Sequence, residues 1–152
     1  MWYRAFSPTL EIIPPAALAE HLQSLGLAAV PHFKGDELGW TTGEFHLPGN
    51  GSPILLAAFR TKEDDLRDDL NSYAAELESM TLSPEAGPLM EKVIQTKQLF
   101  TIRKPVDAAD EIRLERTCEA LAQFLATASN GFYQIDRKGW YSADGRLMVE
   151  EY

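Results

Sequence analysis

The chain has 152 residues, and its 14 Lys and Arg against 23 Asp and Glu give a net charge of −9 at pH 7. A content of 45% hydrophobic and 24% charged residues is typical of a globular domain and excludes a disordered, collagen-like or membrane-protein composition. The acidic balance argues against DNA, RNA and anionic membranes as partners, because Lys and Arg bind these surfaces, and it is compatible with a cationic protein as a partner.

We expect a single domain over residues 1–152 that needs no cofactor, since a chain of this length buries roughly 70% of its unfolded surface. The one cysteine, Cys118, excludes an internal disulfide and a Cys-based zinc cluster. The N-terminus lacks the features of a secretion signal, and the longest apolar run, residues 54–59, is too short to cross a membrane. These features predict a cytoplasmic protein.

The first half of the chain predicts a strand, a helix and three more strands. A strand at residues 2–7 precedes a Pro-containing loop and a helix that runs to Leu25, with Gly26 as its C-terminal signal. Residues 28–33 and 38–47 predict two strands joined by a turn at residues 34–37. Residues 54–59 are apolar at every position, which is typical of a central strand covered on both faces.

The second half predicts helices separated by short strands. Residues 61–64 have the form of a capping box that opens a helix with a buried stripe at Leu66, Leu70, Tyr73 and Leu77. A short helix around residues 89–97, a strand at 99–103 and a long helix at about 109–129 follow. Strands are then predicted at residues 132–136, 139–142 and 146–150, the last two joined by a tight turn at Asp144-Gly145.

These elements predict an α+β fold with an antiparallel-rich sheet of about seven to eight strands and three main helices packed mainly on one face. Residues 1–80 and 98–152 each begin with a strand, a helix and two further strands. The two segments therefore resemble ferredoxin-like β-α-β-β halves, although the same order also arises when common motifs coincide.

An acidic cluster at the start of the second long helix is the strongest charge feature. Helical spacing stacks Asp64 over Asp68 and Asp65 over Asp69. One interpretation is a solvated face, since acids are favoured in a first helical turn; another is a site for a divalent cation. The third is a surface that meets a cationic protein, because stacked like charges are unfavourable in the isolated protein.

The histidines and the cysteine give little support for a metal or covalent site. His32, Glu44 and His46 are zinc-binding residue types, but a turn at residues 34–37 would place His32 opposite Gly39, too far from His46 to share a metal. We therefore expect no metal site. Cys118 lies on the apolar stripe of its helix, and we expect it to be buried and inert.

Two strand tryptophans suggest the one small-molecule site that the sequence offers. Trp40 and Trp140 occupy similar places in the two halves and could flank a groove in which Glu44 or His46 acts as acid or base, although strand aromatics also fill cores. No nucleotide-binding or hydrolase motif is present. We therefore expect a non-catalytic interaction module that uses the acidic cluster. A more specific version of this hypothesis is an immunity protein that binds a basic toxin. The alternative is a small-molecule-binding protein or enzyme that uses the groove.

Overall fold

The computed structural model describes residues 1–49, 51–60, 64–80, 82–106 and 110–151, and it has an α+β fold. The helices in these ranges are α1 (Pro15–Ser24), α2 (Asp64–Glu78), α3 (Ala86–Ile94) and α4 (Glu111–Ala128). The strands are β1 (Trp2–Ser7), β2 (Val30–Asp36), β3 (Gly39–His46), β4 (Ile54–Arg60), β5 (Gln98–Arg103), β6 (Phe132–Ile135), β7 (Gly139–Ser142) and β8 (Leu147–Glu150).

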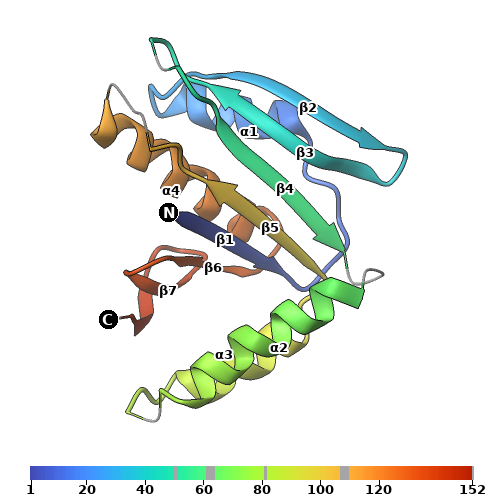
Figure 1. Cartoon of the computed structure of the whole chain (residues 1–152), viewed down its shortest axis with the longest axis vertical. Helices are drawn as coiled ribbons and strands as arrows, with labels where there is room; N and C mark the ends of the chain where they lie inside the picture. The colour runs from blue at the N-terminus through green and yellow to red at the C-terminus, as the bar shows by residue number, and fades with distance from the viewer. Residues whose placement is uncertain (50, 61–63, 81, 107–109, 152) are drawn as a thin grey trace.

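The strands form one eight-stranded antiparallel sheet in the order β2-β3-β4-β5-β1-β6-β7-β8 (Figure 1). The expected α+β class and antiparallel sheet are therefore confirmed. The predicted capping box cannot be compared, because residues 61–63 lie outside the described ranges. Within those ranges, no helix combines the length and apolar character needed to cross a membrane.

Helices cover both faces of the sheet. Ala5 of β1 and Phe100 of β5 lie in a core with α1 and α4, whereas the neighbouring Phe6 and Leu99 lie in a second core with α2 and α3. Successive residues of a strand point to opposite faces, so these two cores lie on opposite sides of the sheet. The expectation that the helices pack mainly on one face was wrong, because the inner strands carry large apolar side chains at consecutive positions.

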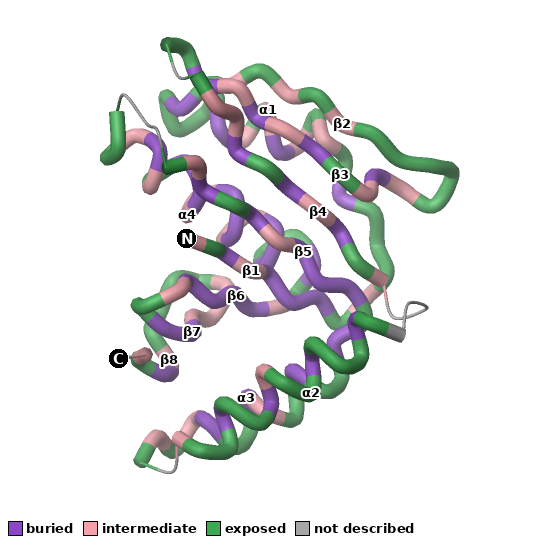
Figure 2. Tube along the Cα trace, in the orientation of Figure 1, coloured by how far each residue is buried: buried purple, intermediate pink, exposed green. Residues whose placement is uncertain are grey.

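The second helical layer is incomplete. The sheet residues in the core with α2 and α3 belong to β1, β5, β6, β7 and β8. In Figure 1 no described helix lies in front of β2, β3 and β4 on this face, and Figure 2 shows buried and exposed positions alternating along β4. The all-apolar segment at residues 54–59 is thus covered on one face only, contrary to expectation.

The strand order does not reproduce two ferredoxin-like halves. After α1 the chain enters the sheet at its edge, and β2, β3 and β4 run inward toward β5. After α4 it enters beside the central strand β1, and β6, β7 and β8 run outward to the other edge. The similar element order of residues 1–80 and 98–152 therefore leads to two different arrangements.

Candidate functional site

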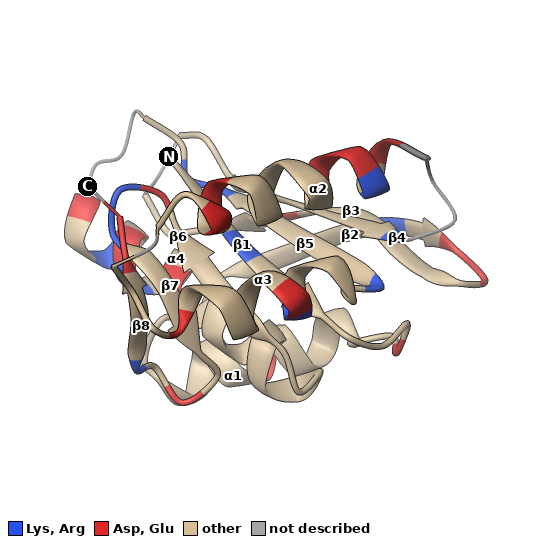
Figure 3. Ribbon diagram, turned by 90° about the horizontal axis from the view of Figure 1, so that it is seen from below, with Lys and Arg blue, Asp and Glu red and all other residues tan. Residues whose placement is uncertain are grey.

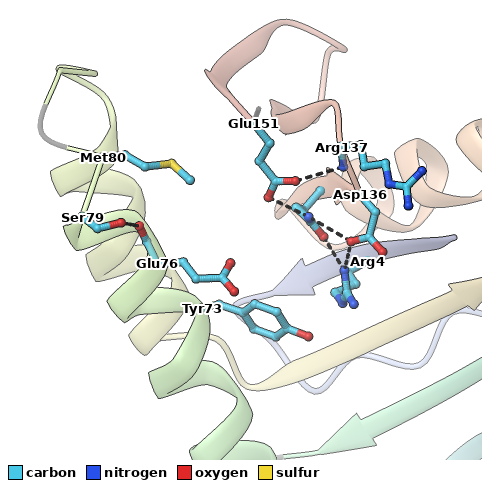
Figure 4. Close-up of a pocket in the computed structure, with 9 residues that line it drawn as sticks. Arg4, Tyr73, Glu76, Ser79, Met80, Asp136, Arg137 and Glu151 are labelled. Carbon is cyan, nitrogen blue, oxygen red and sulfur yellow. Dashed lines mark hydrogen bonds and ion pairs between the residues drawn. The ribbon is translucent and has the colours of Figure 1, made fainter.

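A polar cleft of about 440 Å³ lies between helix α2 and the C-terminal strands (Figure 4). We call it the α2 cleft. Its lining residues are Arg4, Tyr73, Glu76, Ser79, Met80, Gln134, Asp136, Arg137 and Glu151. Helix α2 supplies one wall, β1 and β6 supply the floor, and the segments that follow β6 and β8 supply the other wall. The cleft therefore joins residues from both ends of the chain.

The floor of the α2 cleft is organised by Arg4. Its Nη1 donates hydrogen bonds to Oε1 of Gln134 at 2.8 Å and to Oδ1 of Asp136 at 2.5 Å. The backbone N–H of Trp2 donates to the other carboxylate oxygen of Asp136 at 3.2 Å. The charge of Arg4 is thus matched by Asp136, and the pair is held by the β1–β6 ladder.

Gln134 connects this pair to the far wall. Its side chain is only 3% exposed in the folded protein, and Nε2 donates to Glu151 at 2.9 Å and to Asp136 at 3.3 Å. Glu151 also accepts a hydrogen bond from the backbone N–H of Arg137 at 3.1 Å. Buried amides are stable only when their donors and acceptors are satisfied, so this network fixes the shape of the cleft.

Glu76 is the exception in this network. Among the described residues, no hydrogen bond or ion pair reaches its carboxylate, which points from α2 toward Arg4 and Glu151 (Figure 4). Partial burial, followed by the negative charge of Glu151, raises its pKa, whereas the charge of Arg4 opposes this rise. The cleft is lined by two arginines, Arg4 and Arg137, and by the three carboxylates of Glu76, Asp136 and Glu151, so it has an excess of one negative charge.

Tyr73 closes the inner end of the cleft. The guanidinium of Arg4 lies over its ring, 5.2 Å from the centroid, and the ring meets Phe6 edge-on at 5.6 Å. Burial raises the pKa of the Tyr73 hydroxyl, and the nearby charge of Arg4 partly offsets this effect. Tyr73 is therefore neutral at physiological pH and acts here as a packing surface.

Helix α2 is positioned mainly by its apolar side, where Leu66, Leu70 and Leu77 pack in one core with residues of the sheet. Nη1 of Arg67 donates to the carbonyl oxygen of Ile94 at 2.7 Å and joins α2 to α3. Arg146 of the β7–β8 turn pairs with Glu85 at 2.8 Å, before the start of α3. The packing of α2 on the sheet thus sets the distance between Glu76 and the floor of the cleft.

The residues of the acidic cluster lie on different sides of helix α2. Asp65, Asp68 and Asp69 are exposed, and Asp64 begins the helix, but its side chain is outside the described part of the structure. At about 100° per residue, Asp65 and Asp69 lie within about 20° of Glu76 around the helix, whereas Asp68 is turned about 80° away from it. Two of the predicted residues therefore share the flank of α2 that borders the cleft.

Trp40 and Trp140 do not flank a common groove. Trp40 is buried in the core with α1 and α4, where its Nε1 donates to the carbonyl oxygen of Ile13 at 2.8 Å. Trp140 is fully buried in the core on the opposite face, 5.2 Å from Phe6. The expected groove is thus wrong, because β3 and β7 present these two residues to different sides of the sheet.

Glu44 and His46 lie away from both tryptophan side chains, on the open face of β3. Nε2 of His46 is 3.0 Å from Oε2 of Glu44, and the rings of His32 and His46 are 5.1 Å apart. The turn occupies Asp36 to Gly39, so His32 pairs with Glu44 and not with Gly39. The distance argument against a shared site was therefore wrong. Even so, no three His, Cys, Asp or Glu side chains in the described ranges are arranged to hold a metal ion.

The sequence reasoning missed the residues that build the cleft floor. Arg4 and Gln134 are polar positions on strands whose other residues are mostly apolar, and Asp136 directly follows β6; this pattern was the available signal. Arg4 and Gln134 are 130 positions apart in the chain, so their pairing could not be read from local spacing.

Comparisons of the chain with protein-family models, with curated proteins and with solved structures found no match. The site is therefore interpreted from its own geometry. The α2 cleft has two arginines, of which Arg4 is paired with Asp136, a neutral tyrosine and the unpaired carboxylate of Glu76, and the one cysteine, Cys118, is buried on the opposite side of the sheet. This arrangement has the chemistry of a binding site for a positive charge.

Proposed function

We propose that this protein is a non-catalytic binding module whose α2 cleft receives a positively charged side chain of a protein partner. The observation that carries the proposal is the carboxylate of Glu76, which has no partner among the described residues and lies in a preformed cleft beside Glu151. A lysine or arginine placed between them would replace the repulsion between two carboxylates with two ion pairs.

A protein partner is favoured over a small molecule by the surroundings of the cleft. Asp65 and Asp69 continue the negative charge of Glu76 along α2, well beyond the reach of a single small ligand. An extended acidic stripe raises the rate of association with a basic protein by long-range attraction. This proposal keeps the acidic cluster as an interaction surface and adds the cleft as the place where one side chain is anchored.

Titration of the isotope-labelled protein with a capped Gly-Arg-Gly peptide tests the proposal by NMR. We expect saturable shifts of the Gln134 side-chain amide and of the Arg137 backbone amide, with a Kd on the order of millimolar for one ion-paired group. A capped Gly-Gln-Gly peptide should cause no such shifts. Glu76→Gln should weaken arginine peptide binding at least about fivefold, because it removes the unpaired charge.

Glu78→Gln is the matched control. Glu78 is also an exposed glutamate of α2, but it lies on the side of the helix away from Glu76. Equal effects of the two substitutions would show that only overall charge matters and would overturn the assignment to the cleft. Spermidine binding more than about tenfold tighter than the arginine peptide would instead favour a small cationic ligand.

A further inference from the structure

Strand β4 has an apolar open face. Leu55, Ala57 and Phe59 alternate with Ile54, Leu56 and Ala58, which lie in the core with α1 and α4. Leu55 is 41% exposed and Phe59 is 38% exposed in the folded protein. Strands with one face in water normally carry polar residues at the exposed positions, so this strand has the composition of a segment covered on both sides.

The exposed surface continues onto the neighbouring strands. Arg103 of β5 lies beside Leu55 and pairs on its other side with Trp2 of β1, which is 38% exposed. Leu55 also lines two hollows, one of about 290 Å³ toward β2 and β3 and one of about 450 Å³ toward Arg103 and Val106. We call Trp2, Leu55, Ala57 and Phe59 the open-face patch.

Helix α2 forms an acidic border beside this patch. It begins four residues after the end of β4, and Figure 3 shows its acidic residues on the side of the sheet away from α1. Asp65 and Asp69 share the helix flank with Glu76, which faces the strands. Arg103 lies between Leu55 and Trp2, and its guanidinium is 5.6 Å from the centroid of the Trp2 ring, so this positive charge is at the end of the patch farther from Phe59 and the start of α2.

We propose that the open-face patch docks a basic amphipathic helix of a protein partner. Helices α1 and α4 cover one face of the sheet, and α2 and α3 cover the other face over β1 and β5 to β8, so the apolar strand beside this second layer is suited to contact a further helix. The apolar side of such a helix would contact Leu55 and Phe59, and its basic flank would face Asp65 and Asp69 of α2. This inference rests on the proposed function, because a side chain of the same helix would enter the α2 cleft.

Charge argues against a second copy of this chain as the occupant. The protein carries a net charge of −9, so two copies repel one another at long range. A positively charged helix replaces that repulsion with attraction. The occupant inferred here is thus a basic segment of a different protein.

The test uses an 18-residue synthetic peptide designed as an amphipathic helix, with leucines along one side and lysines along one flank. Three forms are titrated into the full-length protein: the basic peptide, the same peptide with glutamates in place of lysines, and a scrambled basic peptide. We expect the basic amphipathic form to bind at least about tenfold more tightly than the other two. Equal binding of the scrambled peptide would overturn the proposal.

A pair of variants locates the peptide. The double substitution Leu55→Thr and Phe59→Thr should weaken peptide binding at least about tenfold, because it removes the apolar contact and leaves residues suited to a solvated strand. Leu25→Thr with Ile112→Thr is the matched control, since both residues are exposed apolar positions on helices of the opposite face. Binding should change less than about twofold in this control.

NMR of the unmodified protein locates the peptide even if the double variant does not fold. Addition of the basic peptide should shift the signals of Trp2, Leu55 and Phe59 and leave those of Leu25 and Ile112 unchanged. The reverse pattern would overturn the proposal. Analytical ultracentrifugation tests the second copy as occupant. A dimer that the double substitution Leu55→Thr and Phe59→Thr disrupts would identify a second copy as the occupant and overturn the proposal. If Glu76→Gln leaves peptide binding unchanged while Leu55→Thr with Phe59→Thr abolishes it, the cleft proposal fails and the docking patch stands.

Discussion

Arg4 of β1 and Asp136, directly after β6, form an ion pair of 2.5 Å across 132 positions of sequence. Both side chains are largely withdrawn from solvent, so each charge depends on the other. Arg4→Met should lower the free energy of unfolding by about 1–3 kcal/mol, because it leaves Asp136 without its cation and Oε1 of Gln134 without a donor. Urea denaturation measures this loss.

Arg146→Met is the control for the Arg4 prediction. Arg146 also forms one ion pair, with Glu85, but its side chain is exposed, and such pairs contribute less than about 1 kcal/mol. If Arg146→Met lowered the free energy of unfolding as much as Arg4→Met, this result would contradict the structural role given to the network of Arg4, Gln134 and Asp136.

Glu76 should make the protein less stable at neutral pH than a neutral residue would. The pKa of Glu76 is higher in the folded state than in the unfolded state, so protonated Glu76 favours the folded state at low pH. This contribution to the free energy of unfolding is fully present below the pKa of the unfolded state and is lost as the pH rises through the pKa of the folded state. Glu76→Gln should therefore raise the melting temperature at pH 7, and the difference from the unmodified protein should disappear near pH 4, where Glu76 is protonated. A rise in the melting temperature that persists unchanged at pH 4, or an equal rise for Glu78→Gln, would contradict this explanation.

Cys118 was expected to be buried, and this prediction is confirmed. Burial raises the pKa of its thiol from 9.0 to about 12. A bulky maleimide should therefore react slowly with the native protein and rapidly in urea. Because the unfolded thiol ionises first, stability should fall as pH rises from 9 toward 12, and less steeply in Cys118→Ala. Fast labelling of the native protein would contradict this prediction.

Cys118→Ala also measures how tightly the helix α4 packs. The thiol lies on the stripe of α4 that contains Leu114, Leu121 and Leu125, all of which are buried. Removing it should lower the free energy of unfolding by about 1 kcal/mol and leave peptide binding unchanged, because the α2 cleft lies on the other face of the sheet. A change in binding without a change in stability would connect α4 to the site and contradict their separation.

Removal of metal ions should leave the melting temperature unchanged. The two cores are built from apolar side chains, and their packing accounts for folding without a bound ion. Dialysis against a chelator, followed by thermal denaturation, tests this expectation. A fall of several degrees that zinc restores would contradict it, and His32→Ala and His46→Ala would then show whether the histidine pair is responsible.

Local patterning was sufficient to predict most elements of this fold. The strands β1 and β7 have the predicted bounds, and of the predicted buried stripe of α2, Leu66, Leu70 and Leu77 are buried and Tyr73 is half-buried. These features follow from periods of two and 3.6 residues, which depend only on neighbouring positions. The β2–β3 register was wrong because it depends on which residues form the turn, and an error of a few positions there moves His32 from Glu44 to Gly39.

The candidate site was predictable only in part. The acidic flank of α2 follows from helical spacing, since Asp65, Asp69 and Glu76 repeat at intervals of four and seven. Arg4 and Asp136, which lie across the cleft from that flank, come from β1 and from the end of β6, which meet only when the sheet forms around β1. No spacing rule connects residues 130 positions apart, so this half of the site required the tertiary structure.

Composition and short periods are properties of neighbouring residues, so they were sufficient to establish the net charge of −9 and the apolar character of both faces of β4 and to predict most of the helices and strands. The tertiary structure was needed to show that Trp40 and Trp140 lie in separate cores, that α2 lies across a cleft from Arg4 and Asp136, and that Leu55 and Phe59 remain exposed. Strand order and the placement of helices on the two faces depend on packing between distant segments, and that packing creates both the cleft and the open-face patch.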